Sequence, residues 1–254
     1  MITNEYGVEK RQRELLEMIK QLDDELRRMQ IKYSLADGTL LGAIRHNGFI
    51  PWDDDIDIIV SRAEYEKLVK NADRLENFVL RRYLWTPRIQ RLEDRDQRGI
   101  LIPTIDIFIG DAVPASPVVH KLKVILLKML QGMMKEEPEY AGHSAVYKVC
   151  IFLTHALGKL FSQQQMYRAY DRISRIGSKN SSDDVCFYNG TFKYVGTRYR
   201  KATFESYEYH AFEDCELPVT GDYDHFLTVS YGDYMTPPKE SERKSIHVQQ
   251  TSAD

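Results

Sequence analysis

Residues 37–57 read DGTLLGAIRHNGFIPWDDDID, and this stretch decides the fold that we expect. Just before it, residues 31–35 alternate apolar and polar side chains, which is typical of a strand. Residues 40–44 predict a short helix, with Gly38 at the junction between strand and helix. After an Asn-Gly turn and a proline, residues 56–60 form the apolar run of a buried strand. The stretch therefore predicts a strand, a helix and a second strand in close succession.

The sequence on either side extends this prediction. Residues 8–29 carry apolar side chains at spacings of three and four, which predicts an amphipathic helix. Ser61 and Glu64 form a capping box, so a helix should begin there and run towards Leu75. Residues 100–109 predict a third strand. Together these patterns predict an α/β core, in the wider α+β sense, with a mixed sheet.

The second half of the chain is expected to be mainly helical. Apolar periodicity predicts three helices, over residues 118–134, 145–161 and 163–176. Aromatic and β-branched residues predict short strands around a turn at Asn189-Gly190, over residues 186–195 and 203–212. A last helix should end at Gly232 and cover residues 223–231. We therefore expect a catalytic core over 1–115, a helical subdomain over 116–180, and strands, a helix and a polar tail over 181–254.

The composition is that of an ordinary folded protein. Hydrophobic residues make up 43% and charged residues 29% of the 254, which excludes disordered and collagen-like classes. The net charge of −3 argues against a nucleic-acid partner. The three cysteines are far apart, so neither a zinc site nor a disulfide framework is indicated. Without a signal-peptide pattern or a long apolar run, the expected location is the cytoplasm.

Four carboxylates within residues 53–57 carry the chemistry. Such crowding is unfavourable unless the side chains reach solvent or gather round a cation. Asp55 and Asp57 are two positions apart, so they share one face at the start of a strand. Asp106 lies in an equally apolar strand, which a neighbouring position in the sheet could bring beside the pair. The three acids predict a site for Mg²⁺, or for Mn²⁺, of the kind that phosphoryl-transfer enzymes use.

Two alternatives concern the same acids. Asp53 and Asp54 fit either this site or a solvated loop ahead of the strand. The spacing of Asp53, Asp55, Asp57 and Glu64 also matches positions of a calcium-binding EF-hand loop. That loop requires glycine where this chain has Ile58, and the strand continues through it.

Other residues in the stretch fit a phosphate ligand. Gly38 and Thr39 stand where the amide groups of a helix N-terminus, together with a hydroxyl, could hold a phosphate. Arg45 could neutralise charge on a diphosphate, with His46 beside it. Trp52 completes the set of residues that we expect to bind substrate.

Residues 38–57 resemble the signature of the LicD family, which also includes fukutin and fukutin-related protein. A second resemblance lies in residues 223–238, where Tyr231-Gly232-Asp233-Tyr234 looks like the family's C-terminal segment. The resemblance implies a nucleotidyltransferase-like fold and a transferase of the LicD type. Such enzymes move a phosphorylated alcohol, typically phosphocholine from CDP-choline, onto a cell-surface glycan or its lipid-linked precursor. The chain lacks the cysteine cluster of fukutin-related protein, which favours a bacterial type of member.

The resemblance gives five of the expected residues a counterpart in the family. Gly38 and Thr39 match the phosphate-side turn, Asp55 and Asp57 the metal-binding pair, and Asp106 the third carboxylate, which could also accept a hydroxyl proton. Two other functions stay open. A nucleotidyltransferase would transfer the nucleoside monophosphate and release pyrophosphate, and a non-catalytic protein would bind nucleotide or glycan without turnover.

Two further expectations concern the substrates. Choline is a quaternary ammonium, which aromatic faces hold, so a cage could come from among Trp52, Trp85, Tyr188, Tyr194, Tyr231 and Tyr234. A lipid-linked acceptor favours contact with the inner face of the cell membrane. The helix over 118–134 is basic and amphipathic, so it fits either a membrane contact or a core helix with a solvated polar side. That polar side comprises His120, Lys121, Lys128, Gln131 and Lys135.

Overall fold

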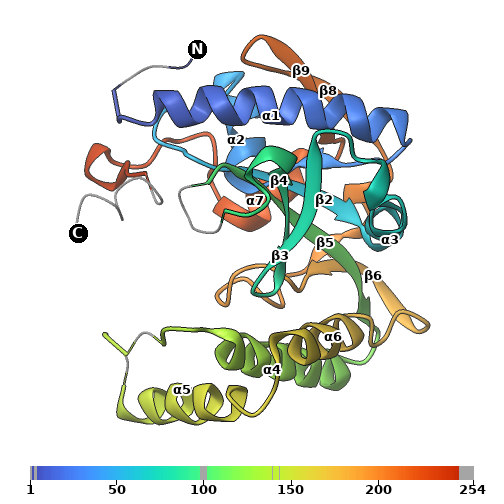
Figure 1. Cartoon of the computed structure of the whole chain (residues 1–254), viewed down its shortest axis with the longest axis vertical. Helices are drawn as coiled ribbons and strands as arrows, with labels where there is room; N and C mark the ends of the chain where they lie inside the picture. Colours follow the sequence, from blue (N-terminus) through green and yellow to red (C-terminus); the bar gives the residue numbers. More distant parts are fainter. Residues whose placement is uncertain (1, 3–4, 98–101, 139, 143, 246–254) are drawn as a thin grey trace. The chain divides into compact units, whose positions relative to one another are not determined.

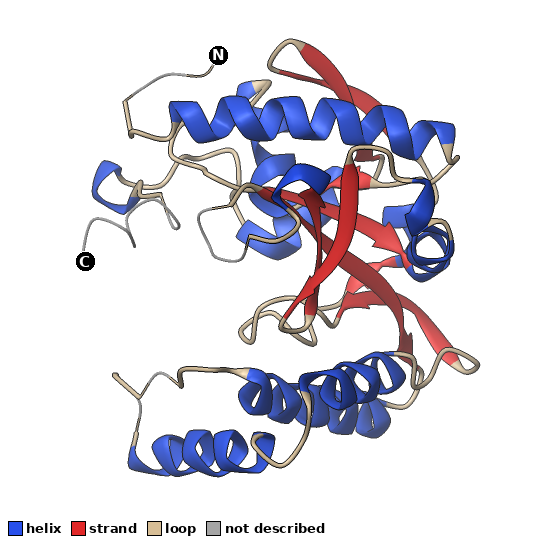
Figure 2. Cartoon of the chain, in the orientation of Figure 1, coloured by secondary structure: helices blue, strands red, loops and turns tan. Residues whose placement is uncertain are grey.

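The computed structural model describes residues 2, 5–97, 102–138, 140–142 and 144–245, which form two compact units. The first unit comprises residues 1–81, 87–108 and 199–254, and the second comprises 82–86 and 109–198. Figure 1 traces the elements of both units, and Figure 2 separates helices from strands. Seven α-helices and a mixed sheet lie in the part of the chain that the structure describes, which confirms the expected fold class.

The sheet of the first unit has the strand order β1-β2-β5-β4-β3. Its strands are β1 (Ser34–Leu35), β2 (Ile56–Ser61), β3 (Phe78–Tyr83), β4 (Thr86–Arg91) and β5 (Thr104–Pro114). β1 runs antiparallel to β2, with Ser34 opposite Ile59, and β4 runs antiparallel to β5, with Arg88 opposite Asp106. Because β2 and β5 are neighbours, Asp57 and Asp106 come from adjacent strands.

Helices and a separate hairpin complete the first unit. The helices are α1 (Glu9–Arg28), α2 (Asp37–His46), α3 (Arg62–Lys70) and α7 (Tyr223–Tyr231). A two-stranded sheet pairs β8 (Tyr207–Phe212) with β9 (Cys215–Thr220), and β7 (Tyr199–Arg200) is a short strand. Single 3₁₀ turns cover Ala72–Arg74, Leu92–Asp94, Lys201–Phe204 and Glu240–Glu242. Gly232 caps α7 with a positive φ of 71°, as the sequence predicts.

The predicted helix over residues 8–29 is confirmed as α1. Its apolar stripe, which includes Leu15, Ile19 and Leu22, is buried, and its outer faces are charged. Such a helix gains most of its stability from packing its apolar face. Figure 1 shows α1 as a long straight helix along one side of the first unit.

The helix in the signature begins earlier than expected. α2 starts at Asp37 instead of residue 40, so Gly38 lies in the first turn and not at the strand-to-helix junction. Inside α2, a Cβ at Gly42 would lie 2.4 Å from the carbonyl oxygen of Gly48. Glycine is therefore required where α2 packs against the loop that leads to the acids.

The capping box at the start of α3 is half formed. The Ser61 hydroxyl accepts the Glu64 amide, at 3.2 Å, as expected. The Glu64 carboxylate accepts instead from the amide of Lys32, at 3.1 Å. The acid therefore joins α3 to the segment before β1, and the helix ends at Lys70 ahead of a 3₁₀ turn.

The second unit combines three helices with two strand segments. α4 (Pro117–Met134), α5 (Ala145–Gly158) and α6 (Gln163–Ser174) confirm the predicted helical region. β6 (Ser181–Phe187) runs antiparallel to the second half of β5, with Gly110 opposite Phe187. The hydrophobic core of the second unit includes Leu127, Met166 and Tyr188. Residues 181–198 therefore belong with the helices and not with the C-terminal part, which differs from the expected division.

The pattern of strands shows three errors in the sequence analysis. β3, β4 and β9 were not expected, because they carry polar and charged residues at many positions. The two predicted strands around Asn189 do not form one hairpin, since β6 pairs with β5 and β8 with β9. The predicted strand at 100–109 begins at Thr104, and its positions 100 and 101 lie outside the described residues.

The interpretation of α4 as a core helix with a solvated polar side is wrong, because its apolar side is exposed; the interpretation as a membrane contact stays a prediction. Its polar residues His120 and Gln131 are buried, whereas Leu122 is 55% and Ile125 45% exposed. None of the described helices is by itself long and apolar enough to cross a membrane. α5 and α6 satisfy the length and hydropathy criteria only together, with a bend of 114° between them.

Candidate active site

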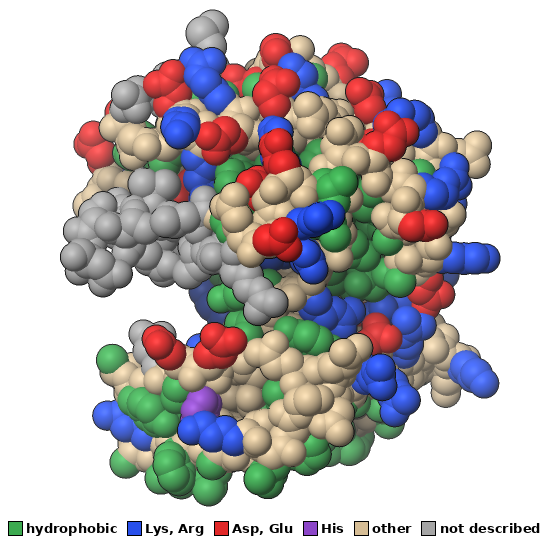
Figure 3. Space-filling model, viewed as in Figure 1, with side chains coloured by type: hydrophobic (Ala, Val, Ile, Leu, Met, Phe, Trp, Pro, Cys, Tyr) green, Lys and Arg blue, Asp and Glu red, His purple; other side chains and the backbone are tan. Residues whose placement is uncertain are grey.

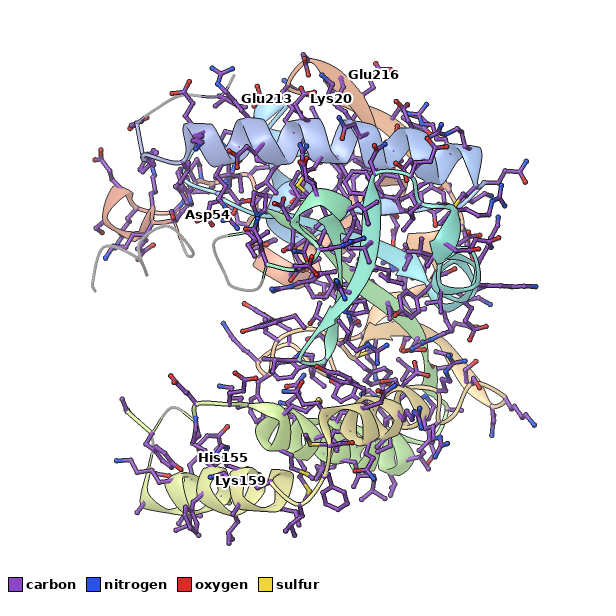
Figure 4. The ribbon with its side chains drawn as sticks, in the orientation of Figure 1. Lys20, Asp54, His155, Lys159, Glu213 and Glu216 are labelled. Atoms are coloured by element: carbon purple, nitrogen blue, oxygen red, sulfur yellow. The ribbon has the colours of Figure 1, made fainter. Side chains whose placement is uncertain are left out.

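Side chains of α1 donate hydrogen bonds to the acidic loop between α2 and β2, which contains Asp53 and Asp54. Arg11 Nε donates to the carbonyl of Asp54 at 2.5 Å, and Gln12 Nε2 donates to the carbonyl of Asp53 at 2.7 Å. Figure 4 labels Asp54 beneath the N-terminal half of α1. Nothing in the sequence pattern of α1 points to these contacts, because hydrogen bonds to backbone carbonyls need no particular partner residue.

The alternative of a solvated loop is wrong for Asp53 and Asp54. Asp54 is only 1% exposed, and its Oδ2 accepts from the hydroxyl of Ser245 at 2.8 Å. Asp53 is half-buried, and its Oδ2 is buried without a hydrogen-bond partner. Both acids therefore belong to the structured surroundings of the predicted pair.

Asp55 and Asp57 alternate with buried isoleucines, as the strand pattern predicts. Ile56 and Ile58 are fully buried, and Asp57 between them is half-buried. The amide of Asp57 donates to the Thr39 hydroxyl at 2.9 Å, and Thr39 is 1% exposed. Thr39 thus joins the first turn of α2 to the start of β2, a contact that holds the first turn of α2 beside the acids.

The carboxyl groups at this site raise one another's pKa. Burial and then Asp55 raise the pKa of Asp37 to about 6. Burial raises the pKa of Asp53 well above its usual range, with Asp55 and Asp54 adding to the effect. The pKa of Asp57 is raised well above its usual range by burial, and then by the nearby carboxylates of Asp55, Asp37, Asp106 and Asp53. Asp57 and the four acids that act on it therefore form one interacting group, which a positive charge would stabilise.

The backbone brings Asp37 and Gly38 into contact with this group. Asp37 has a positive φ of 41°, which is uncommon for a residue other than glycine. A Cβ at Gly38 would lie 2.7 Å from Oδ2 of Asp53. Gly38 therefore leaves room for the Asp53 carboxylate, a contact that was not predicted. The binding of phosphate by Gly38 stays a prediction.

Asp106 is joined to a residue that the sequence analysis missed. Its carboxylate forms a two-pronged ion pair with Arg88, at 2.6 Å to Nε and 2.9 Å to the terminal nitrogen. Both side chains are 21% exposed. Since the two residues lie opposite each other on β4 and β5, the pairing could have been found only by predicting β4. Bidentate pairing fixes the orientation of the Asp106 carboxylate.

Arg45 and His46 stand where α2 meets the C-terminal segment. A terminal nitrogen of Arg45 donates to the carbonyl of Tyr234 at 2.7 Å, so the two parts of the sequence that carry the family resemblance are in contact. Burial, with Arg243 nearby, lowers the pKa of Arg45, while Tyr231 acts in the opposite sense. Burial and Arg45 lower the pKa of His46, which favours its neutral form at pH 7.

Among the aromatic residues expected to hold choline, Tyr231 interacts electrostatically with the acids. Burial raises the pKa of Tyr231, and Asp37, Asp57, Asp53 and Asp55 raise it further. Trp52 contacts Tyr6 edge-on and lies under the guanidinium of Arg243, at 5.4 Å. The hydroxyl of Tyr234 donates to Asp224.

Three other aromatic residues from the expected set, Trp85, Tyr188 and Tyr194, lie in the second unit. Tyr188 is fully buried there, and the indole of Trp85 donates to the carbonyl of Gly190. Their place in a cage stays a prediction.

The donor set fits Mg²⁺. Within the described ranges, no three His, Cys, Asp or Glu side chains converge closely enough to form a complete cage of protein ligands. Mg²⁺ seldom uses such a cage, since it binds one or two carboxylates, several waters and the phosphates of a substrate. The buried, unpartnered Oδ2 of Asp53 beside Asp55 is an oxygen ligand of the right kind.

These features define the class of the protein. Paired aspartates lie at the start of one strand of a mixed sheet, with a third acid on the next strand and Gly38-Thr39 in the first turn of the preceding helix. This arrangement is expected of a nucleotidyltransferase domain. A family model described as the LicD/FKTN/FKRP nucleotidyltransferase domain matches residues 30–97, which include the whole signature.

The relatives agree with this assignment. The chain is 30% identical over 248 residues to the lipopolysaccharide cholinephosphotransferase LicD of Haemophilus influenzae, covering 88% of this chain and 89% of that protein. It is also 48% identical over 50 residues to an uncharacterised protein of Rickettsia typhi, covering 20% and 16% of the two chains. The chain belongs to the LicD family, and it is a phosphotransferase.

Proposed function

We propose that this protein is a Mg²⁺-dependent enzyme that moves phosphocholine from CDP-choline onto a hydroxyl of a cell-surface glycan or its lipid-linked precursor. The observation that carries this proposal is the group of five interacting aspartates around Asp57. Isolated from a cation, such a group destabilises the fold, so its presence needs a functional reason. The name of the Haemophilus relative, which specifies choline phosphate and lipopolysaccharide, supports the choice of donor and acceptor class.

Each residue of the site has a proposed part. Asp55 and Asp57, together with Asp53, would hold Mg²⁺, or Mn²⁺ in its place. When bound, the ion would neutralise charge on the diphosphate of the donor. Arg45, at the C-terminal end of α2, adds a fixed positive charge towards the phosphates. Gly38, Thr39, His46 and Trp52 remain proposed contacts of the substrate.

Asp106 is proposed to accept the proton of the attacking hydroxyl. Its pairing with Arg88 sets the direction of the carboxylate, so Arg88 is a positioning residue in this scheme. Replacing Arg88 with lysine keeps the charge and loses the two-pronged geometry. The Arg88→Lys variant should therefore have a lower kcat and an unchanged KM for CDP-choline.

Choline itself is proposed to meet an aromatic face at Tyr231. Quaternary ammonium groups are held by such faces together with nearby negative charge. Tyr231→Phe keeps the ring and should retain the KM for CDP-choline, whereas Tyr231→Leu should raise it. We also propose that the protein acts in the cytoplasm, at the inner face of the cell membrane, because its acceptor is linked to lipid.

The test is release of CMP from CDP-choline with and without Mg²⁺. The variants Asp55→Asn and Asp57→Asn, which preserve shape and remove charge, should each abolish release. Asp73→Asn, on an exposed turn of the same unit, is the matched control and should leave the rate unchanged. Full turnover by a folded Asp55/Asp57 double variant would contradict the proposal.

The same assay separates the other functions. A nucleotidyltransferase releases pyrophosphate from a nucleoside triphosphate in place of CMP. A binding protein shifts its melting temperature with CDP-choline and shows no turnover at any acceptor concentration.

A further inference from the structure

The helices α4 and α5 of the second unit leave long apolar stripes exposed. On α4 the stripe runs through Val118, Leu122, Ile125 and Met129, which are 41–67% exposed. On α5 and just after it, the stripe runs through Val146, Val149, Leu153, Leu157 and Leu160, which are 40–76% exposed. Figure 3 shows hydrophobic side chains gathered along the lower edge of the view, over α5 and the adjoining part of the unit. We call these two stripes the α4–α5 face.

The orientation of α4 is fixed by polar contacts on its opposite side. Lys123 is 1% exposed, donates to the carbonyl of Ile176 at 3.0 Å, and lies 3.7 Å from the ring centre of Tyr188. Gln131 donates to the hydroxyl of Tyr170 and to the carbonyl of Gly190, each at 3.0 Å. Turning the apolar stripe inwards would break these contacts and leave the polar groups without hydrogen-bond partners. The outward apolar stripe is therefore a property of the folded unit.

The helix α5 is packed on one narrow side only. Gly158 is its single buried residue, and a Cβ there would lie 2.1 Å from the carbonyl oxygen of Met133 on α4. A Cβ at Gly132 would lie 2.8 Å from the hydroxyl of Thr154. Small residues thus bring α5 close to α4 and leave the rest of an apolar helix uncovered. Such a helix is expected to be buried against something else.

The charge on both helices has one sign. Neither α4 nor α5 contains Asp or Glu, and their charged residues are Lys121, Lys123, Lys128 and Lys148. Lys121 and Lys148 are exposed, and Lys159 follows α5 at the point that Figure 4 labels beside His155. Apolar side chains flanked by lysine are typical of a helix that lies in the interface of an anionic membrane. A second copy of this chain would present lysines to lysines.

We propose that the α4–α5 face docks on the surface of an anionic lipid bilayer, with the apolar stripes entering the interface and the lysines facing the head groups. The proposal concerns an interaction surface and does not require that the donor be CDP-choline. If the acceptor is linked to lipid, as proposed above, docking places the enzyme on the membrane that holds it.

Flotation of the full chain with lipid vesicles tests the proposal. The protein should float with vesicles of phosphatidylcholine and phosphatidylglycerol, and less with phosphatidylcholine alone. Added salt should lower the bound fraction, because it screens the lysines. The double variant Leu153→Glu/Leu160→Glu should reduce binding by about ten-fold or more. The control Val69→Glu places a glutamate on an exposed apolar site of α3, and should bind as the wild type does.

A native cysteine gives a second readout. Cys150 is exposed, and its position between Val146 and Leu153 places it on the α5 stripe. Burial raises the pKa of the Cys186 thiol to about 12 and that of Cys215 to about 11, so a polarity-sensitive dye reacts first at Cys150. The emission of the dye should shift to the blue on anionic vesicles, and a quencher carried on lipid chains should reduce it.

Several outcomes would overturn the proposal. Equal flotation of the double variant and the wild type would do so, as would a dye that stays in water on bound vesicles. A wild-type dimer in solution that the double variant converts to monomer would assign the face to a second copy. The Asp57→Asn variant should float normally, so loss of activity at the acids and loss of binding at the α4–α5 face are measured separately.

Discussion

The two units break the ordinary rule of burial in opposite ways. The first unit places a group of carboxylates among buried strands, where each raises the pKa of its neighbours. The second unit leaves apolar side chains exposed along two helices while burying Lys123 and Gln131. In both, the unfavourable groups are confined to one place and the surrounding structure is well packed. Each departure coincides with a place where we propose a partner, namely a cation and diphosphate in the first unit and a bilayer in the second.

The largest effect expected from this contrast is between two phenylalanines on helices. Phe226 of α7 is 1% exposed and stacks on Tyr199 with ring centres 4.7 Å apart, whereas Phe152 of α5 is 60% exposed. Phe226→Ala should lower the free energy of unfolding by about 3–5 kcal/mol, as for other buried aromatics. Phe152→Ala should change it by less than about 0.5 kcal/mol. Denaturant unfolding measures both, and comparable losses would show that α5 is packed in solution.

Two helical glycines provide a smaller and equally direct comparison. A Cβ at Gly42 meets backbone, whereas a Cβ at Gly132 meets the hydroxyl of Thr154, a side chain that can rotate. Gly42→Ala should therefore destabilise the protein by about 1–3 kcal/mol through overpacking. Gly132→Ala gains helix propensity of up to about 1 kcal/mol, which offsets its crowding. Thermal unfolding of the pair checks this, and a stable Gly42→Ala variant would contradict the close approach of α2 and the loop.

The response to Mg²⁺ should depend on pH. Burial and Asp55 raise the pKa of Asp37 to about 6, so its favourable protonated form is present below this pH and is lost as pH rises through it. Without Mg²⁺, the melting temperature should therefore fall as the pH rises through about 6. Added Mg²⁺ should raise the melting temperature more at pH 7.5 than at about pH 5, because ligands must be deprotonated to bind.

Asp37→Asn removes the titrating group and should flatten this pH dependence. Melting curves at matched ionic strength, with Ca²⁺-free buffers, separate specific binding from screening. A response to Mg²⁺ that is the same at both pH values would contradict the coupling of Asp37 to the site.

Much of the first unit could be predicted from the sequence because its signals are local. The stripe of α1 repeats over five turns, and the isoleucines around Asp57 alternate with it on one strand. The missed strands β3 and β4 show the limit of such signals. Their sequences, FVLRRY and TPRIQR, carry no clean alternation, and they become strands by pairing within a sheet that forms from distant segments.

In the candidate site, too, local patterns predict some features and miss others. The sequence singled out Asp55, Asp57 and Asp106 as candidates, because carboxylates in apolar strands are unusual wherever they occur, and their role as ligands stays a prediction. The hydrogen bonds from Arg11 and Gln12, the Arg88 ion pair and the contact of Arg45 with Tyr234 join residues that are 18 to 189 positions apart. No local pattern encodes them. The inward polar side of α4 was mistaken for the same reason, since its partners Tyr170, Tyr188 and Gly190 lie elsewhere in the chain.

The most direct test of the central claim is the melting temperature of Asp57→Asn with and without Mg²⁺. If the acids are kept for a cation, removing one of them relieves repulsion. The variant should then melt above the wild type without Mg²⁺, lose the upward shift that Mg²⁺ gives the wild type, and release no CMP. A variant that melts below the wild type and still responds to Mg²⁺ would contradict the account, because Asp57 would then be a structural residue.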